Sequence, residues 1–384
     1  MDPTGQSGLI EKLISEIERG GNITFARFME AALYDPEGGY YTSGRDPFGP
    51  EGDYITSPEV HSVFGKMIAR QLIPLFDSVR SDGPVSLVEM GTGRGDLTGD
   101  VLDEIRREAP SLFGRIDCRV IERSPPMILR QKEILGKKGL SEKVAWSDSL
   151  DSLRPTGGIA GCFLSNELVD AFPVHRVAMT EDGLKEAYVT VRDGRLAEVL
   201  LEPSTPELRS YFDRVRVGLV PGQKAEVNLN AVRWMKEVAG RLDRGFVVTI
   251  DYGHAAADLF SQVHMNGTLL CYHRHTVAET PYHNVGKQDI TAHVDFTTLA
   301  LTGREAGLEV TGFTDQKHFL MSMGLAEEME GMDPQGREFN AMKRLVADSA
   351  MGKTFKLLFQ HKNVTPPPLR GLSFRPFFKD ALFR

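Results

Sequence analysis

At 384 residues the chain is longer than a typical single domain, so its length predicts one core with large additions, or two domains. Hydrophobic residues make up 41% and charged residues 26%, which is enough apolar material to bury a sizeable core. The net charge of −8 argues against a broad phosphate-binding surface, so nucleic acid is not an expected partner.

The sequence contains no sign of export or membrane insertion. No apolar stretch approaches the ~18 residues that are needed to span a bilayer. Residues 1–20 include acids and lack the basic, apolar and small-residue pattern of a leader peptide. Cys118, Cys162 and Cys271 are scattered without metal-ligand spacing, which is typical of buried free thiols in a reducing compartment. Together these features predict a cytoplasmic protein.

Helical patterns dominate the first part of the chain. Apolar residues at helical spacing predict an amphipathic helix over 9–17, and Thr24 is placed to cap a helix over 25–33. The segment 34–58 is irregular and rich in tyrosine, and a loop of this length is commonly functional. A further helix is predicted over about 59–76.

From residue 85 the pattern changes to short apolar runs that alternate with helices. Predicted strands cover 85–90, 118–122, 144–147 and 159–165, and predicted helices cover 97–108 and 126–135. Alternation at this spacing predicts an α/β fold with a doubly wound, mostly parallel sheet of the Rossmann-like type.

This rhythm breaks after Pro173. Three segments up to residue 201 alternate like antiparallel strands, and a helix over 230–242 leads into a strand over 245–252. We interpret the break as an inserted small α+β region, after which a helix over 296–306 and a strand over 308–313 complete the core. The predicted parts are 1–84 (helical cap and lid loop), 85–172 (first part of the core), 173–244 (insertion), 245–320 (second part of the core) and 321–384 (C-terminal extension).

A glycine-rich turn follows the first core strand. Glu89 ends the apolar run, and Gly91, Gly93 and Gly95 follow at alternate positions, where the missing Cβ atoms allow the backbone to approach a ligand closely. A dinucleotide fingerprint would have glycine or alanine at position 96, which is Asp96 here. The pattern therefore argues against a nicotinamide oxidoreductase, although a purely structural turn stays open.

Acids also end the next two strands. Glu122 is placed to accept the two hydroxyls of a ribose, and Asp148 is placed to meet the exocyclic amine of an adenine. Acids at three successive strand ends beside a glycine-rich turn are the layout of class I methyltransferases. We therefore expect Glu89, Glu122 and Asp148 to bind S-adenosyl-L-methionine, with three unrelated surface acids as the alternative.

The fourth strand ends in a second polar group. Asn166, Glu167 and Asp170 offer one amide and two carboxylates on a short turn, and these are the candidate catalytic residues. Methyl transfer requires an aligned nucleophile, and two carboxylates suit a guanidinium because they can hold its planar N–H donors and assist loss of a proton. The plain alternative is a helix start that Asn166 caps.

Several segments in this order resemble the MidA-like S-adenosyl-L-methionine-dependent methyltransferases, a family that includes a mitochondrial complex I assembly-factor arginine methyltransferase. The matching segments are 23–29 (ITFARFM), 39–41 (GYY), 52–59 (GDYITSPE), 89–95 (EMGTGRG), 121–125 (IERSP), 166–174 (NELVDAFPV), 250–253 (IDYG) and 286–296 (GKQDITAHVDF). The resemblance spans about residues 23–320.

The resemblance implies N-methylation of a protein, with arginine as the target and S-adenosyl-L-homocysteine as the product. It also implies that Tyr41, Thr56 and Ser57 belong to a lid over the cofactor. A non-catalytic assembly factor with the same fold and a small-molecule methyltransferase remain alternatives, and the insertion provides either substrate contacts or a homodimer surface. No metal is expected, because the histidine spacing fits no compact ligand set.

Polar residues also alternate with apolar ones late in the second part of the core. Asp289 and Thr291 flank Ile290, for example, so their side chains are predicted to share one face of a strand. Two interpretations stay open, a strip that faces the substrate or a half-exposed strand.

Overall fold

The chain forms two compact units, each built from three separate segments. The computed structural model describes residues 6–44, 53, 56–79, 83–153, 158–273, 276–277, 280–374 and 381–383. The first unit comprises Met1–Tyr54, Val169–Arg233 and His254–Thr298, and the second comprises Ile55–Leu168, Trp234–Gly253 and Leu299–Arg384. The division into five parts made from the sequence remains a prediction.

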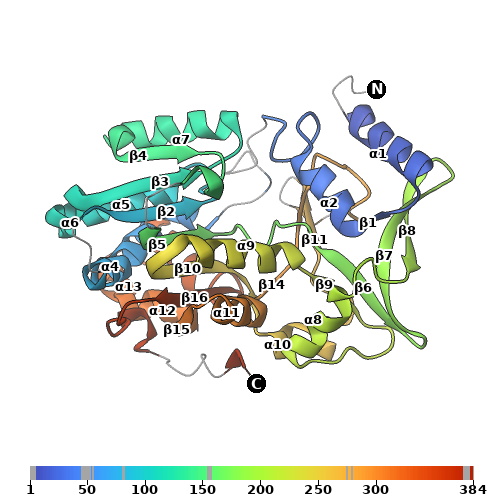
Figure 1. The fold of residues 1–384 in the computed structure, drawn as a ribbon. Helices are drawn as coiled ribbons and strands as arrows, with labels where there is room; N and C mark the ends of the chain where they lie inside the picture. The colour runs from blue at the N-terminus through green and yellow to red at the C-terminus, as the bar shows by residue number, and fades with distance from the viewer. Residues whose placement is uncertain are drawn as a thin grey trace. The chain divides into compact units, whose positions relative to one another are not determined.

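A central sheet forms the middle of the second unit. Its strands lie in the order β15 (Glu309–Asp315), β16 (Phe355–Lys362), β10 (Leu242–His254), β5 (Ile159–Asn166), β2 (Val85–Met90), β3 (Ile116–Ile121) and β4 (Val144–Ser147). Figure 1 shows them side by side, from β4 near the top of the view to β15 near the bottom. The strands from β10 to β4 are parallel to one another. The predicted Rossmann-like fold is therefore confirmed.

One strand of this sheet is absent from the sequence prediction. Strand β16 lies between β10 and β15 and is antiparallel to both. The expectation that residues 308–313 complete the core is therefore wrong. The sheet also needs β16, which comes more than forty residues later in the chain. Four apolar residues of β16 are buried, as expected for an interior strand covered on both faces.

Helices cover this sheet. In the second unit they are α3 (Ser57–Val60), α4 (Val63–Ser78), α5 (Asp96–Glu108), α6 (Pro110–Arg115), α7 (Pro125–Lys137), α12 (Gln316–Met323), α13 (Leu325–Met329) and α14 (Arg337–Val346). The helix predicted over 59–76 is divided into α3 and α4, since His61 between them has an extended backbone with φ −166°. The break ends α3 after one turn, and Thr56 and Ser57 lie at the N-terminus of this short helix.

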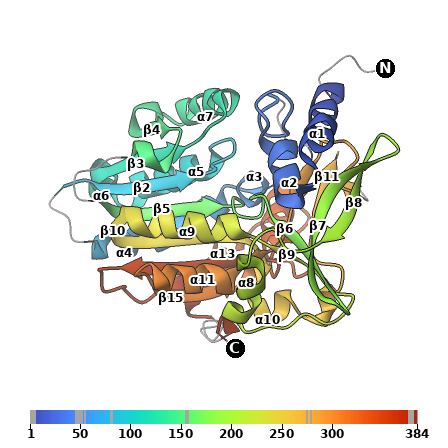
Figure 2. The ribbon, with the colours of Figure 1, turned by 45° about the vertical axis from the view of Figure 1, so that its right-hand side comes forward.

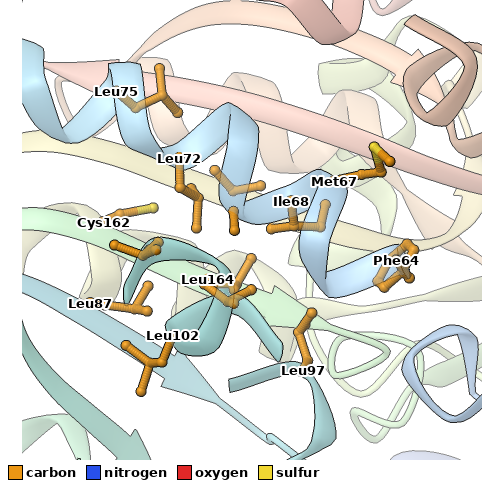
Figure 3. Close-up of a cluster of buried hydrophobic side chains, with 14 of the residues drawn as sticks. Phe64, Met67, Ile68, Leu72, Leu75, Leu87, Leu97, Leu102, Cys162 and Leu164 are labelled. Atoms are coloured by element: carbon orange, nitrogen blue, oxygen red, sulfur yellow. The ribbon is translucent and has the colours of Figure 1, made fainter. Parts of the chain in front are cut away.

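Packing between α4, α5 and the sheet forms the main hydrophobic core. Phe64, Ile68 and Leu72 recur at helical spacing on α4 and are all buried. Figure 3 shows this face of α4 directed at Leu87 of β2 and Leu164 of β5. The core therefore fixes the two strands whose ends carry the polar residues predicted to be functional.

Gly245 of β10 is essential for the close pairing of the central strands. Its φ is +127°, and an added Cβ would lie 1.9 Å from the backbone oxygen of Gly161 on β5. We expect Gly245→Ala to lower the free energy of unfolding by roughly 3–5 kcal/mol, because a backbone atom cannot move aside as a side chain can. Denaturant unfolding measures this loss. Gly240→Ala is the control, since nothing lies within 4 Å of its added Cβ; equal midpoints for both variants would contradict the prediction.

The first unit contains two small sheets. One has the order β1 (Ile23–Thr24), β7 (Gly183–Arg192), β6 (His175–Thr180) and β9 (Lys224–Val227), with β8 (Arg195–Leu201) paired to β7, and the other has the order β12 (Thr276–Val277), β11 (Leu270–His273) and β13 (Asp289–Thr291). Figure 2 shows β6 to β9 as a twisted antiparallel sheet. The predicted antiparallel strands of the insertion are therefore confirmed.

The first unit also has short helices. They are α1 (Gln6–Gly20), α2 (Phe25–Tyr34), α8 (Glu207–Val215) and α10 (Ala256–Leu259); α9 (Leu229–Arg241) and α11 (Phe296–Glu305) cross the boundary, and β14 (Val294–Asp295) precedes α11. The Thr24 side chain accepts a hydrogen bond from the backbone N–H of Arg27, as predicted for its cap. Phe25 and Phe28 of α2 pack with Ile290 of β13 in a separate hydrophobic core. Ten residues of the predicted loop over 34–58, namely 45–52 and 54–55, lie outside the described residues.

Candidate active site

The glycine-rich turn joins β2 to α5. Gly91, Gly93 and Gly95 have φ values of +65°, +55° and +94°, a region that residues with a Cβ rarely adopt. The backbone N–H of Gly95 donates to the oxygen of Thr92 at 3.0 Å, which closes the turn at the start of α5. The three glycines therefore form a tight turn after β2, and their predicted role in cofactor binding stays a prediction.

Glu89 lies beneath this turn and is almost completely buried, with 1% of its surface exposed. Its carboxylate accepts a hydrogen bond from the Thr98 hydroxyl of α5, and Thr92 and Thr98 are themselves joined at 3.0 Å. Burial raises the pKa of Glu89 to about 7, although the hydrogen bonds from Thr98 and Thr92 act against the rise. Through these hydrogen bonds, the buried Glu89 side chain connects the glycine-rich turn to α5.

The raised pKa of Glu89 makes stability depend on pH. Between pH 4.5 and 7 the unfolded chain ionises this carboxyl while the folded protein keeps it protonated, so stability is lost as the pH rises through this window. Glu89→Gln keeps the hydrogen-bond acceptor and cannot ionise. We expect the wild type to lose roughly 3 kcal/mol of unfolding free energy, relative to Glu89→Gln, as the pH rises from 4.5 to 7. Denaturant unfolding from pH 4.5 to 8 measures it, and a difference that does not change with pH would refute it.

Glu122 follows the end of β3 and is held in place by several donors. One of its oxygens accepts the backbone N–H groups of Arg123 and Ser124 at 2.8 and 2.9 Å, and the other accepts from the side chain of Gln131 at 3.0 Å. Burial raises the pKa of Glu122, with these hydrogen bonds acting in the opposite direction. The carboxylate is therefore fixed in orientation at the strand end where it was predicted.

Gln131 of α7 is a site residue that the sequence analysis missed. It is fully buried, and its amide group also donates to the Gly93 backbone oxygen at 2.8 Å and accepts from the Trp146 ring at 2.8 Å. One side chain thus joins the glycine turn, the end of β3 and strand β4. The signal was a polar residue on an otherwise apolar helix face, since Met127 and Leu135 four residues away on either side are buried too.

Asp148 follows β4 on the same edge of the sheet and is exposed. Its backbone oxygen accepts a hydrogen bond from the Arg123 side chain at 3.3 Å, beside Glu122. The ends of β2, β3 and β4 therefore present Glu89, Glu122 and Asp148 in the predicted order, although Glu89 is buried and Asp148 exposed.

Asn166 and Glu167 lie at the end of β5. Glu167 has a φ of +51°, an uncommon conformation for a residue with a side chain and one that is often found at functional sites. One oxygen of its carboxylate accepts from the Asn166 side chain at 3.1 Å and from the Ser57 backbone N–H at 3.3 Å. Asn166 is buried, and no described residue donates a hydrogen bond to its Oδ1 atom. Such an oxygen at a strand end is available to accept an N–H group.

Ser57 and Thr56 reach this position through α3. Thr56 forms a capping box with Glu59, whose carboxylate accepts both its backbone N–H and its hydroxyl. The Ser57 hydroxyl donates to Gln316 at 3.1 Å. The structure therefore brings Ser57 beside Glu167, while the side chain of Thr56 serves the start of the helix.

Two other predicted residues belong to the first unit. Asp170 is buried, and its backbone oxygen accepts from the N–H of Ala292 at 3.0 Å. The Tyr41 hydroxyl donates to the buried carboxylate of Asp289 at 2.9 Å. The predicted roles of Asp170 in catalysis and of Tyr41 in cofactor binding stay predictions.

Residues 67–314, more than half of the chain, match one protein family, which is described as "Putative S-adenosyl-L-methionine-dependent methyltransferase". The chain belongs to this family. The methyltransferase therefore uses S-adenosyl-L-methionine, and the family resemblance drawn from the sequence is confirmed.

Relatives and solved structures align along most of the methyltransferase. Proteins named "Protein arginine methyltransferase NDUFAF7, mitochondrial" are 26% identical in Xenopus tropicalis, covering 97% of this chain and 91% of the relative, and 28% identical in Homo sapiens, covering 88% and 78%. A crystal structure of a Burkholderia thailandensis protein bound to S-adenosyl-homocysteine is 29% identical, covers 96% of this chain and 95% of its own, and superimposes with a TM-score of 0.86.

These comparisons correct one expectation from the sequence. The predicted cytoplasmic location conflicts with the relatives, which are named as mitochondrial proteins, and is therefore wrong. The prediction rested on the lack of a leader pattern in residues 1–20, the lack of a long apolar stretch and the scattered cysteines. Among the residues that the structure describes, no helix has both the length and the apolar character to cross a membrane.

Proposed function

We propose that the methyltransferase methylates an arginine side chain of a protein substrate. Relatives named as protein arginine methyltransferases match 91% of this chain in Danio rerio and 92% in Drosophila melanogaster. The proposal also fits the candidate catalytic residues, because a guanidinium has several N–H donors and needs acceptors around it.

The cofactor site proposed here lies in the second unit. The glycine turn would let the backbone approach the cofactor, Glu122 would accept the ribose hydroxyls and Asp148 would meet the adenine amine. The carboxylate of Glu122 fits this role, because a hydrogen bond from the Gln131 side chain fixes its orientation. Bound S-adenosyl-L-methionine supplies a methyl group on a positively charged sulfur.

The observation that carries the catalytic proposal is the buried Oδ1 atom of Asn166, which receives no hydrogen bond from a described residue. A buried acceptor without a donor costs about 1–3 kcal/mol, so it favours a ligand that supplies an N–H group. Beside it lies the carboxylate of Glu167, and Asp170 follows three residues later in the chain.

We assign these residues complementary tasks. Asn166 accepts one N–H of the guanidinium and fixes the plane of the group, while Glu167 holds the positive charge next to the nucleophilic nitrogen. Asp170 stays a candidate for a contact with the substrate. The free guanidinium is protonated at neutral pH, so one N–H proton must leave as the new N–C bond forms. The carboxylate of Glu167 is placed to receive that proton.

Methyl labelling tests the function. Purified protein is incubated with methyl-deuterated S-adenosyl-L-methionine and extracts from cells that lack it, and modified peptides are identified by mass spectrometry. We expect the label on arginine nitrogen, and not when Asn166→Ala replaces the wild type. Label on lysine, or in small molecules only, would overturn the arginine assignment. Cofactor binding without any label would favour an assembly factor that acts by binding.

A further inference from the structure

Three of the buried acids in the first unit lie close enough to influence one another, and two of these three accept a hydrogen bond from a tyrosine. Asp53, Asp170 and Asp289 are only 1%, 5% and 3% exposed. The Tyr40 hydroxyl donates to Asp53 at 2.8 Å, and the Tyr41 hydroxyl donates to Asp289 at 2.9 Å. Burial of a carboxylate is unfavourable unless polar or charged groups stabilise it, so a site with several buried acids suits a positively charged ligand.

The acids repel one another. Burial, followed by the negative charge of Asp170 and with a smaller contribution from Asp53, raises the pKa of Asp289 to about 8, against the effect of the Tyr41 hydrogen bond. Tyr272 of β11 lies opposite Asp289 in the sheet, and its pKa is raised by burial and then by Asp289 and Asp170. The strongest influences on Asp289 therefore include no cation, and a bound cation would relieve the repulsion.

A separate observation also indicates a ligand here. Thr291 is 2% exposed, and its hydroxyl has no hydrogen-bond partner among the described residues. Asp289 and Thr291 occupy alternate positions of β13, so both side chains point to the face opposite Ile290, which packs in the hydrophobic core. A buried polar atom is thus directed to the same side of β13 as the side chain of Asp289.

Aromatic rings lie beside these acids. The rings of Tyr34 and Tyr41 stack with centroids 5.6 Å apart, and the ring of Tyr40 meets Tyr41 edge-on at 5.0 Å. The Tyr34 hydroxyl donates to the backbone oxygen of Ala171, next to Asp170. Aromatic faces attract cations, and they stack well on a planar guanidinium.

We propose that Asp170, Asp289 and Tyr41 form a pocket in the first unit that binds the guanidinium of the substrate arginine, with the Thr291 hydroxyl as a further acceptor. This inference rests on the proposed function and adds the residues that recognise the target side chain. A metal ion is the less suitable occupant, since the described residues contain no group of three or more His, Cys, Asp or Glu that could hold one. Five N–H donors in one plane match two carboxylates better than the compact ammonium of lysine does.

Binding through this pocket must release a proton. Because the pKa of Asp289 is raised to about 8, its carboxyl group has to lose a proton below that pH before it can pair with a cation. The guanidinium itself keeps its charge throughout, so the pH dependence belongs to the protein. Affinity should consequently rise with pH up to about 8 and then level off.

The test uses the full chain and the probe acetyl-Gly-Arg-Gly-amide, with the citrulline and lysine peptides for comparison. Ligand-observed NMR gives the dissociation constants from pH 6 to 9, with and without S-adenosyl-homocysteine. We expect the arginine peptide to bind more tightly than both others, and its affinity to rise by up to about tenfold per pH unit below pH 8. The neutral citrulline peptide should show no such rise.

Asp289→Asn should lower the affinity for the arginine peptide at pH 8.5 by at least about tenfold and abolish its pH dependence. Tyr41→Phe keeps the ring and should lower the affinity less. The matched control is Asp295→Asn, because Asp295 is also buried in the first unit and accepts a tyrosine hydroxyl, that of Tyr211 at 2.8 Å. Its pH dependence should remain that of the wild type.

Equal binding of the arginine and citrulline peptides by the wild type would overturn the pocket, as would an unchanged affinity and pH dependence in Asp289→Asn. The comparison of the arginine and citrulline peptides uses only the wild-type protein, so it tests the proposal even if a variant fails to fold. Failure of the proposed function gives a different result, in which the arginine peptide binds with the expected pH dependence and labelling finds no methylated arginine.

Discussion

Glu122→Gln is expected to weaken the binding of S-adenosyl-homocysteine by about 10- to 100-fold. The carboxylate is held by two backbone N–H groups and by Gln131, so its oxygens are oriented before a ligand arrives. A hydrogen bond to a charged group is worth about 1.5–3 kcal/mol, which corresponds to this loss. Glutamine has nearly the same volume, so the fold should be retained. Calorimetric titration measures the change.

Glu133→Gln is the matched control for this variant. Glu133 lies on α7, the helix that carries Gln131, but its side chain is exposed and pairs with Lys137 at 2.7 Å. Exposed pairs of this kind contribute little, so its affinity should equal that of the wild type. Wild-type affinity in Glu122→Gln would instead show that the end of β3 does not hold the ribose.

Asp170→Asn is expected to lower the turnover of methyl transfer by about 10²- to 10⁴-fold, the range typical of a lost general base or charge partner. The affinity for S-adenosyl-homocysteine should not change, because Asp170 is proposed to act on the substrate, whereas Glu122 and Asp148 are proposed to bind the cofactor. Single-turnover rates with labelled cofactor, together with calorimetry, separate the two effects.

An exposed aspartate provides the comparison. Asp182 lies in the turn between β6 and β7 and is exposed, so Asp182→Asn should leave the rate unchanged. If Asp170→Asn transfers methyl groups at the wild-type rate, Asp170 has no part in catalysis. If it instead loses cofactor affinity and rate in equal proportion, its role is in binding the cofactor.

Local pattern was sufficient to predict the central strands and the residues at their ends. The position of Glu122 could be predicted because parallel strands end at the same edge of a sheet. The spacing of the glycines predicted the turn. Strand β16 could not be placed in this way. It pairs with β10 across more than a hundred residues of chain, and its position inside the sheet depends on tertiary packing that a local window does not contain.

The residues missed at the site share the same cause. Gln131 is important through contacts to three separate elements, which no spacing along α7 reveals. Asp289 and Thr291 were predicted to share a strand face, with a half-exposed strand as one interpretation, and both are in fact buried. Burial of a polar residue depends on what packs over it, so the sequence identified the face and could not identify its environment.

The order of the central sheet limits how the chain can be divided. Strand β5 has β2 on one side and β10 on the other, while β10, β16 and β15 all come from later in the chain. A truncated protein that ends soon after Asn166 would keep the glycine turn and Glu122, but it would leave one edge of β5 with unpaired N–H and C=O groups and a row of apolar side chains. Such an open edge favours association with other chains. Recombinant cofactor-binding fragments should therefore extend through Lys362.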